Sequence, residues 1–401
     1  MDRQSIVITG LGTVSSAGEG VNNFFNSLCE GRTFISEVTE FDTTNHLCKK
    51  ASLINNFDPF NYLGKKSDKY GRTTQLTISS VLLALEDSKM SHDYLKSKKV
   101  GIILGTAMGE SRPLDAMCVI DLENKAPDKN EVLKLPDNMI ASNTAGYLNI
   151  NAYTLMIPNA CSAGNYAMAY SMELLKQGKI DIAITGGCDS FTKYAFFGFD
   201  RMMSLSPDLC RPFDKNRKGI IIGEGAGIII MERMEDAQKR NTGIYSEMAG
   251  YGFSSDSFHM TIPHEEGIIR VLRNVLNNSG IDPSEVDLVS AHGTGTPMND
   301  KLECRALNEV FKKSLEKIPV ISIKSMIGHT MGASSALEAI TCIMSIKHSK
   351  IPPTANFETY DPECAVDCVP NKMREKNIDT AMNNNFAFGG NNAGVIFKKI
   401  G

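Results

Sequence analysis

The segment that decides the fold reads Tyr153-Thr-Leu-Met-Ile157 and continues as Pro158-Asn-Ala-Cys-Ser-Ala-Gly164. An apolar run of strand character passes through a loop of small residues into a segment of helical character. The second half of the chain repeats this order, because Val320-Ile-Ser-Ile323 leads through Lys324-Ser-Met-Ile-Gly-His-Thr-Met-Gly332 into another helical segment. A strand, a loop and a helix that recur in this way indicate an internal duplication.

Other segments match between the two halves. The run Ser5-Ile-Val-Ile-Thr-Gly-Leu-Gly12 has the same Gly-x-Gly bend as Glu247-Met-Ala-Gly-Tyr-Gly-Phe-Ser-Ser255, and each half closes on an apolar strand. Strands that alternate with helical segments predict sheets covered by helices. We therefore predict an α/β fold of two related halves, residues 1–243 and residues 244–401, whose loop-to-helix junctions face a shared site.

Composition narrows the class of protein. The chain has 401 residues, 42% of them hydrophobic and 22% charged, and its net charge of −4 provides no basic field for a nucleic acid. Ten cysteines are too sparse for a disulfide scaffold, and no apolar run approaches the roughly 20 residues of a membrane span. We expect a cytoplasmic protein with reduced cysteines that binds neither nucleic acid nor a membrane.

The glycine-rich loops do not match nucleotide-binding motifs. Gly10 and Gly12 follow a strand, but Ser15 stands where the dinucleotide fingerprint needs its third glycine, and no phosphate-binding loop with Gly-Lys-Ser/Thr occurs. Glycines that allow tight turns and close packing explain these loops better. We expect no nucleotide cofactor.

One cysteine and two histidines stand in loops suited to catalysis. Cys161 lies between a strand and a helix, where the helix dipole and free N–H groups favour a thiolate. His292 and His329 lie in glycine-rich segments of the second half. Each residue alone is compatible with a structural role, and together they indicate nucleophilic catalysis. A metal site is the alternative, but no metal-ligand spacing supports it, so no metal is expected.

Four motifs connect the chain to a known family: Ala160-Cys-Ser-Ala-Gly164, His292-Gly-Thr-Gly-Thr-Pro297, Lys324-Ser-Met-Ile-Gly-His329 and Asn385-Phe-Ala-Phe-Gly-Gly390. With them, and over essentially its whole length, the chain resembles the elongating β-ketoacyl-acyl-carrier-protein synthases of the thiolase fold. The resemblance implies two βαβαβαββ halves stacked as an α-β-α-β-α sandwich.

The resemblance also implies a decarboxylative Claisen condensation. Cys161 would attack an acyl thioester, and His292 and His329 would donate hydrogen bonds to the enolate formed when a malonyl group loses CO2. Lys324 would place a cation beside the site and complete the catalytic set. The supporting residues would be Glu338, Asp300, Thr294 and Thr296.

Further roles follow from the same resemblance. The N–H groups of Cys161 and Phe388 would form an oxyanion hole, and Phe388, next to Gly389, would be a mobile gate. Simple core packing of the two phenylalanines in that motif explains the local sequence equally well. Met108 and Phe197 would line the acyl pocket.

The expected partner is an acyl carrier protein, which delivers both substrates on its phosphopantetheine arm, so the enzyme itself needs no cofactor. Carrier proteins are acidic, and the docking patch would consist of Lys65, Lys66, Lys69 and Arg201. We expect a dimer, either of two identical chains or with a non-identical chain-length factor.

Some positions depart from the commonest family pattern. Asn391 replaces a threonine and Ala387 a glycine, while Ile323-Lys-Ser-Met-Ile-Gly-His329 together with Asp361-Pro-Glu-Cys-Ala-Val-Asp367 resembles ketosynthase subunits of type II polyketide synthases. We predict that role, with housekeeping fatty-acid elongation as the alternative. A non-catalytic chain-length factor would lack Cys161, and a degradative thiolase would need a second catalytic cysteine in the C-terminal half.

Overall fold

Strands and helices alternate twice in the same order. The computed structural model describes residues 5–115, 117, 126 and 128–400. The first half consists of β1 (Ile6–Ser15), α3 (Arg72–Asp87), β5 (Val100–Thr106), α7 (Asn138–Leu148), β6 (Ala152–Pro158), α8 (Ala163–Lys176), β7 (Ile182–Asp189) and β8 (Gly225–Arg233). The second consists of β9 (Ser246–Ser255), α11 (Glu265–Ser279), β10 (Leu288–Ser290), α12 (Pro297–Phe311), β11 (Val320–Ile321), α14 (Ser334–His348), β14 (Thr380–Phe386) and β15 (Asn391–Lys398). Both halves follow the βαβαβαββ order, as predicted.

Shorter elements connect this framework. The helices among them are α1 (Val21–Cys29), α2 (Phe60–Leu63), α4 (His92–Lys96), α6 (Lys129–Val132), α9 (Lys193–Arg201), α10 (Met234–Lys239) and α13 (Lys324–Ile327). The short strands are β2 (Gly18–Glu19), β3 (Ser36–Glu37), β4 (Lys50–Ala51), β12 (Lys350–Ile351) and β13 (Arg374–Glu375). None of the helices in the described residues combines the length and the apolar composition that crossing a membrane requires.

The two halves also share one strand order. In space the strands run β6-β5-β7-β8-β1 and β11-β10-β14-β15-β9. In each set the first three strands are parallel and the last two pair antiparallel. The register shifts in β1 between Ile8 and Gly10, and in β9 where it pairs with Ile396 and Phe397 of β15. The sets are joined edge to edge where Val7 and Ile8 of β1 pair with Glu247 and Ser246 of β9. The fold is therefore a structural duplication with a pseudo-twofold axis between β1 and β9.

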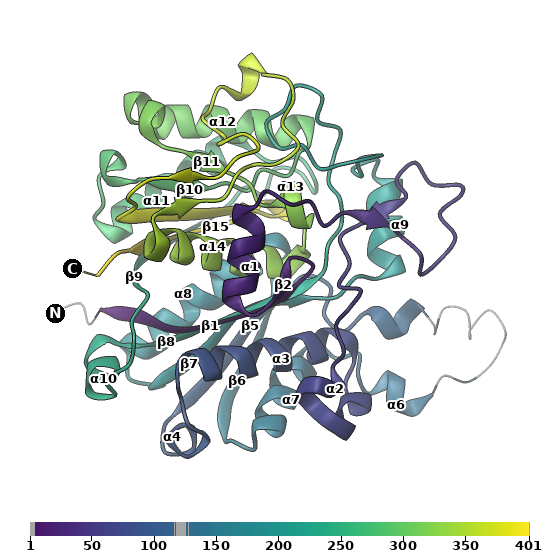
Figure 1. The fold of residues 1–401 in the computed structure, drawn as a ribbon, viewed down its shortest axis with the longest axis vertical. Helices are drawn as coiled ribbons and strands as arrows, with labels where there is room; N and C mark the ends of the chain where they lie inside the picture. The colour runs from purple at the N-terminus through teal and green to yellow at the C-terminus, as the bar shows by residue number, and fades with distance from the viewer. Residues whose placement is uncertain (1–4, 116, 118–125, 127, 401) are drawn as a thin grey trace.

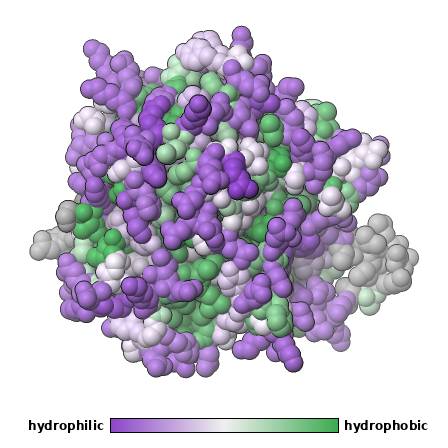
Figure 2. Space-filling view, in the orientation of Figure 1, coloured by the Kyte–Doolittle hydropathy of each residue, from purple (hydrophilic) through white to green (hydrophobic). Residues whose placement is uncertain are grey.

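Strands β1, β5, β7 and β14 are buried along their whole length, with helices on both faces, which produces five layers (Figure 1). In β8, Ile228 and Ile230 pack in one hydrophobic cluster with residues of α3 and α7, whereas Ile229 and Met231 pack in another with residues of α8 and α14. A third cluster joins the outer face of the second sheet to α11 and α12. Helices α8 and α14 thus form a central layer between two sheets. Hydrophilic residues cover most of the face seen in Figure 2.

The two junctions predicted to form the site meet at the N-terminal ends of this central layer. The 3₁₀ turn η2 (Ala160–Ser162) precedes α8, and the turn η5 (Met331–Ala333) precedes α14. The first residue of each turn, Ala160 or Met331, has a left-handed backbone with φ of 47° or 52°. The strand β11 is shorter than its predicted range to residue 323, because the chain turns there into α13 and carries Lys324 into the interior.

Candidate active site

Cys161 occupies the middle of η2, where β6 gives way to α8. Its side chain is only 8% exposed and lines a cavity of about 460 Å³. His292 and His329 line the same cavity, and one side-chain atom of each of these three residues lies within 4.8 Å of the others. The structure therefore brings together the three residues that the sequence singled out.

Burial disfavours the charged form of the Cys161 thiol. Burial raises the pKa of Cys161 to about 12, although the nearby Lys324 ammonium acts in the opposite direction. The loss of water around the sulfur therefore opposes the thiolate that the helix N-terminus is predicted to favour. The amide N–H of Cys161 faces its own sulfur.

His292 follows β10 and is held mainly through its backbone. Its N–H donates to Glu303 Oε1 at 2.8 Å, the next N–H, of Gly293, donates to Glu303 Oε2 at 2.8 Å, and its carbonyl accepts a hydrogen bond from Lys324 Nζ at 2.7 Å. The side-chain amide nitrogen of Asn385 lies 3.5 Å from His292 Nδ1. These contacts hold the backbone of His292 and reach Nδ1 of its ring. None of them involves Nε2.

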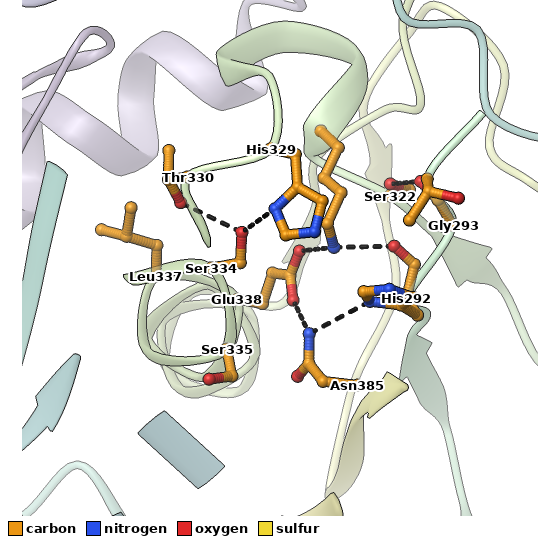
Figure 3. A network of polar contacts seen from close by, with 12 residues as sticks. His292, Gly293, Ser322, His329, Thr330, Ser334, Ser335, Leu337, Glu338 and Asn385 are labelled. Atoms are coloured by element: carbon orange, nitrogen blue, oxygen red, sulfur yellow. Dashed lines mark hydrogen bonds and ion pairs between the residues drawn. The ribbon is translucent and has the colours of Figure 1, made fainter. Parts of the chain in front are cut away.

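His329 has a defined tautomer. The backbone N–H of Met331 donates to Nδ1 at 3.1 Å. Ser334 Oγ lies 3.0 Å from the same nitrogen (Figure 3). Because a backbone N–H can only donate, the proton of the neutral ring is on Nε2. Burial and the charge of Lys324 lower the pKa of both His292 and His329, so both rings are neutral near pH 7.

A buried ion pair lies beneath the two imidazoles. Lys324 and Glu338 are each only 1% exposed, and their ammonium and carboxylate form an ion pair. Asn385 Nδ2 donates to the other carboxylate oxygen at 2.7 Å. Since breaking a buried pair leaves an uncompensated charge, these three side chains form one structural unit under His292.

The distances between Cys161, His292 and His329 would suit a metal ion, but the protonation does not. A metal needs an unprotonated ring nitrogen from each histidine. In His329, Nδ1 already accepts the Met331 N–H and Nε2 carries the proton. The three groups fit the role of nucleophile and hydrogen-bond donors better than that of metal ligands.

The predicted supporting residues divide into two groups. Thr294 and Thr296 line the cavity with their hydroxyls 3.0 Å apart, and Thr296 caps α12. Asp300 is fully buried behind this loop, where it accepts hydrogen bonds from the N–H groups of Phe213 at 2.9 Å and Gly295 at 3.2 Å. Burial raises the pKa of Asp300. Asp300 therefore shapes the loop without lining the cavity.

The predicted gate borders the cavity. Phe388 is 37% exposed, and its ring centroid lies 5.7 Å from that of Phe199. Gly389 has a φ of 83°, a conformation that favours glycine, and donates its N–H to the carbonyl of Met260 at 2.8 Å. Phe388 thus lines the cavity with a large side chain.

The two residues expected in the acyl pocket lie outside the lining of this cavity. Met108 is half-buried and packs with the cluster that contains Met331. Phe197 is exposed and stacks on His46 with ring centroids 5.0 Å apart. Phe199, on the same helix, lines the cavity instead.

The four basic residues expected to dock a carrier are exposed. Lys65, Lys66 and Lys69 belong to the 3₁₀ segment η1 (Gly64–Lys69), and none of them lines the cavity. Arg201 ends α9, two residues from the cavity-lining Met203.

Three residues that contact the histidines were not predicted from the sequence: Glu303, Asn385 and Ser334. Glu303 and Ser334 carried no signal of their own, since each bonds to the site only after helices α12 and α14 fold. Asn385 heads a motif that the sequence singled out for its phenylalanines.

The comparisons agree along the whole chain. The model of the β-ketoacyl synthase N-terminal domain matches residues 3–237, and that of the C-terminal domain matches residues 245–358. The chain is 34% identical to a 3-oxoacyl-[acyl-carrier-protein] synthase 2 of Synechocystis, with 100% of this chain and 99% of the relative covered. It is 35% identical to the protein of the same name in Coxiella burnetii, with full coverage of both.

Solved structures with a thiolase-like ketosynthase fold superpose closely. The ishigamide ketosynthase/chain length factor is 37% identical with a TM-score of 0.96 and full coverage of both chains. A type II polyketide synthase acyl-carrier protein in complex with its ketosynthase bound to the hexaketide matches with 25% identity, a TM-score of 0.92 and full coverage of both chains. The chain therefore belongs to the β-ketoacyl synthase family and is an acyltransferase that forms carbon–carbon bonds.

Proposed function

We propose that this enzyme extends an acyl chain held on Cys161 with the two-carbon unit of a malonyl group, as the ketosynthase subunit of a type II polyketide synthase in the cytoplasm. The observation that carries the proposal is the shared cavity, into which Cys161 faces together with two neutral imidazoles. Both substrates would arrive on the phosphopantetheine arm of an acyl carrier protein, and the two cavity-lining threonines, Thr294 and Thr296, would hydrogen-bond that arm.

The first half-reaction transfers the acyl group. The sulfur of Cys161 attacks the thioester carbon, a new carbon–sulfur bond forms, and the bond to the carrier thiol breaks. The proton of the neutral thiol passes to the departing carrier sulfur, so no resting thiolate is needed. The N–H groups of Cys161 and Phe388 would stabilise the oxyanion of the tetrahedral intermediate.

The second half-reaction breaks and makes a carbon–carbon bond. The malonyl group loses CO2, its bonding electron pair passes into an enolate, and His292 and His329 donate Nε2–H hydrogen bonds to the enolate oxygen. The enolate carbon then attacks the acyl carbonyl carbon and expels Cys161 as a thiolate, which takes up a proton. Lys324, paired with Glu338, would hold His292 in place and keep both rings neutral.

The exposed cations Lys65, Lys66, Lys69 and Arg201 would attract an acidic carrier. Phe388 would swing on Gly389 to admit the second substrate. Met108 and Phe197 lie outside the cavity lining, so they would bound only an acyl chain that extends beyond it. The 37% identity to a ketosynthase that is described with a chain length factor supports a heterodimer.

Fatty-acid elongation by a homodimer is the second candidate function. It is favoured by the curated relatives, which are 34–35% identical over their full length and carry the name 3-oxoacyl-[acyl-carrier-protein] synthase 2. The two functions differ in what the purified chain does alone.

Reconstitution with acyl- and malonyl-loaded carrier, followed by intact-protein mass spectrometry, tests both. A polyketide ketosynthase is expected to be inactive or poorly soluble alone and to recover on co-expression with a chain-length factor. A fatty-acid enzyme is expected to form 3-oxoacyl carrier alone as a dimer. A monomer with full condensing activity would contradict both, and failure of Cys161 to gain the acyl mass would overturn the proposed nucleophile.

A further inference from the structure

Asp189 is a fully buried carboxylate that the proposed mechanism does not use. It ends β7, and its two oxygens receive four hydrogen bonds. Oδ1 accepts from Thr106 Oγ1 at 2.6 Å and from the Met108 N–H at 2.9 Å. Oδ2 accepts from the Ala107 N–H at 2.8 Å and from the Gly332 N–H at 2.6 Å. The carboxylate thus connects a loop of the first half to the turn η5 of the second.

The contact with Gly332 acts on His329. Gly332 directly follows Met331, the residue whose N–H donates to His329 Nδ1. Met331 has a φ of 52°, a conformation that a non-glycine residue holds only when its surroundings impose it. The hydrogen bond from the Gly332 N–H to Asp189 holds the peptide group between Met331 and Gly332. With that peptide held, the Met331 N–H keeps its direction toward His329 Nδ1.

The contacts with residues 106–108 act on the expected acyl side. Met108 packs against the hydrophobic cluster that includes Met331. The backbone of the loop also lies close to η5, since a Cβ added to Gly332 would lie 2.5 Å from the nitrogen of Ala107. Thr106 Oγ1 also accepts the Gly109 N–H at 2.8 Å, which stiffens the loop. A displacement of Met108 therefore has a direct route to the turn that holds His329.

We propose that Asp189 is a positioning residue that keeps His329 in its Nε2–H tautomer and couples its orientation to the Thr106–Met108 loop. The inference rests on the proposed role of His329 as a donor to the enolate. The ionised Asp189 carboxylate accepts hydrogen bonds at both oxygens. In Asp189→Asn one of these oxygens becomes an NH2 group, which donates and therefore cannot bond to the two donors that it faces. The effect of losing Asp189 is expected in decarboxylation and not in acyl transfer to Cys161.

The experiment compares Asp189→Asn with a control, Asp87→Asn. Asp87 also accepts a strand N–H, from Leu11 at 2.8 Å, and a hydroxyl, from Tyr245 at 2.9 Å, away from the cavity. We expect Asp189→Asn to lower malonyl decarboxylation about tenfold or more while acylation of Cys161 changes less than about threefold. In Asp189→Asn the ring 15N chemical shifts of His329 should no longer show a neutral ring with its proton on Nε2. A His329→Ala variant assigns these signals. Asp87→Asn should alter neither partial reaction.

Equal losses in both partial reactions, or an unchanged His329 spectrum, would overturn the inference. If Asp189→Asn does not fold, Thr106→Val and Thr106→Ser replace it, and decarboxylation is expected to fall with valine and recover with serine. Equal rates in that pair would also count against the coupling. If His329→Ala keeps full decarboxylation, the proposed function fails. If His329→Ala loses decarboxylation and Asp189→Asn does not, only the role of Asp189 fails.

Discussion

The two turns that precede the central helices, η2 and η5, have similar backbones but different surroundings. Both η2 and η5 follow a parallel strand of their half, open on a residue with positive φ, and lead into a buried helix. The middle residue is Cys161 in η2 and Gly332 in η5. The Cys161 N–H faces its own thiol beside the cavity, whereas the Gly332 N–H is taken by the carboxylate of Asp189. Reactivity therefore depends on what occupies the turn and not on its backbone.

The strand register explains how the difference arises. Asp189 pairs with Gly225, the first residue of β8, and the matching position before β15 is Ala387, whose N–H donates to the carbonyl of Asn391. The position next to η5 is therefore occupied by the carboxylate of Asp189, and the matching position in the other half by the methyl group of Ala387. A Cβ added to Gly332 would lie 2.5 Å from the nitrogen of Ala107, so the second turn has no room for a nucleophile.

Removing the nucleophile should have the largest effect. Cys161→Ala is expected to lower condensation by at least about 1,000-fold, because no other cysteine of the described residues lines the cavity. The measurement is the steady-state rate with loaded carriers. Cys48→Ala removes a buried thiol elsewhere and should keep nearly full activity. Comparable losses in both variants would point to damaged packing and not to chemistry.

The histidines should separate the two half-reactions. His292→Ala and His329→Ala are each expected to lower malonyl decarboxylation by about 100-fold or more, since each removes one donor to the enolate, while Cys161 still accepts an acyl group. Release of labelled CO2 and the acyl mass on Cys161 measure the two steps. His348→Ala, whose ring stacks on Phe25 instead, is the control. Lost acylation with intact decarboxylation would reverse the assigned roles.

Alkylation probes the state of the thiol in η2. The rate at which iodoacetamide labels Cys161 should rise about tenfold per pH unit between pH 7 and 9, because a pKa of about 12 leaves little thiolate in that range. Peptide mapping at several pH values gives the rate. A rate that levels off near pH 7 would mean that the helix N-terminus does ionise the resting thiol.

A methyl group in η5 tests the crowding of the second turn. Gly332→Ala is expected to lower the free energy of unfolding by about 1–3 kcal/mol, since its Cβ meets backbone atoms. Gly146→Ala in α7, where nothing lies within 4 Å, should instead be neutral or stabilising by about 0.5–1 kcal/mol. Thermal unfolding compares the two. Equal Tm values for Gly332→Ala and Gly146→Ala would show that the backbone around η5 can move to accommodate a methyl group.

The smallest expected change is with pH. Burial lowers the pKa of both histidines below the ordinary 6.5, so neither gains a proton until the solution is more acidic than that. Malonyl decarboxylation should therefore change less than about twofold between pH 7 and 8. Burial raises the pKa of Asp189 to about 6, so an inflection below pH 7 that disappears in Asp189→Asn would belong to that carboxyl group. An inflection near pH 6.5 that persists in Asp189→Asn would mean that at least one ring titrates normally.

The sequence was most informative where a pattern repeats. The duplicated order of strands and helices, Cys161, His292 and His329 were all visible from spacing and motifs. The ionisation of Cys161 was not, because burial is a property of the assembled cavity. Glu303 and Asp189 were also invisible, since a carboxylate that holds distant backbone N–H groups leaves no local pattern.

The shared central layer has a consequence for how the chain folds. Helices α8 and α14 come from different halves, yet their side chains belong to one hydrophobic cluster that also takes in the inner faces of both sheets, including Ile229 of the first and Val395 of the second. Neither half can bury that surface alone, so a break near residue 243 divides the sequence without dividing the folding unit. Each fragment would expose an apolar face and aggregate, and the intact chain should unfold in a single cooperative step.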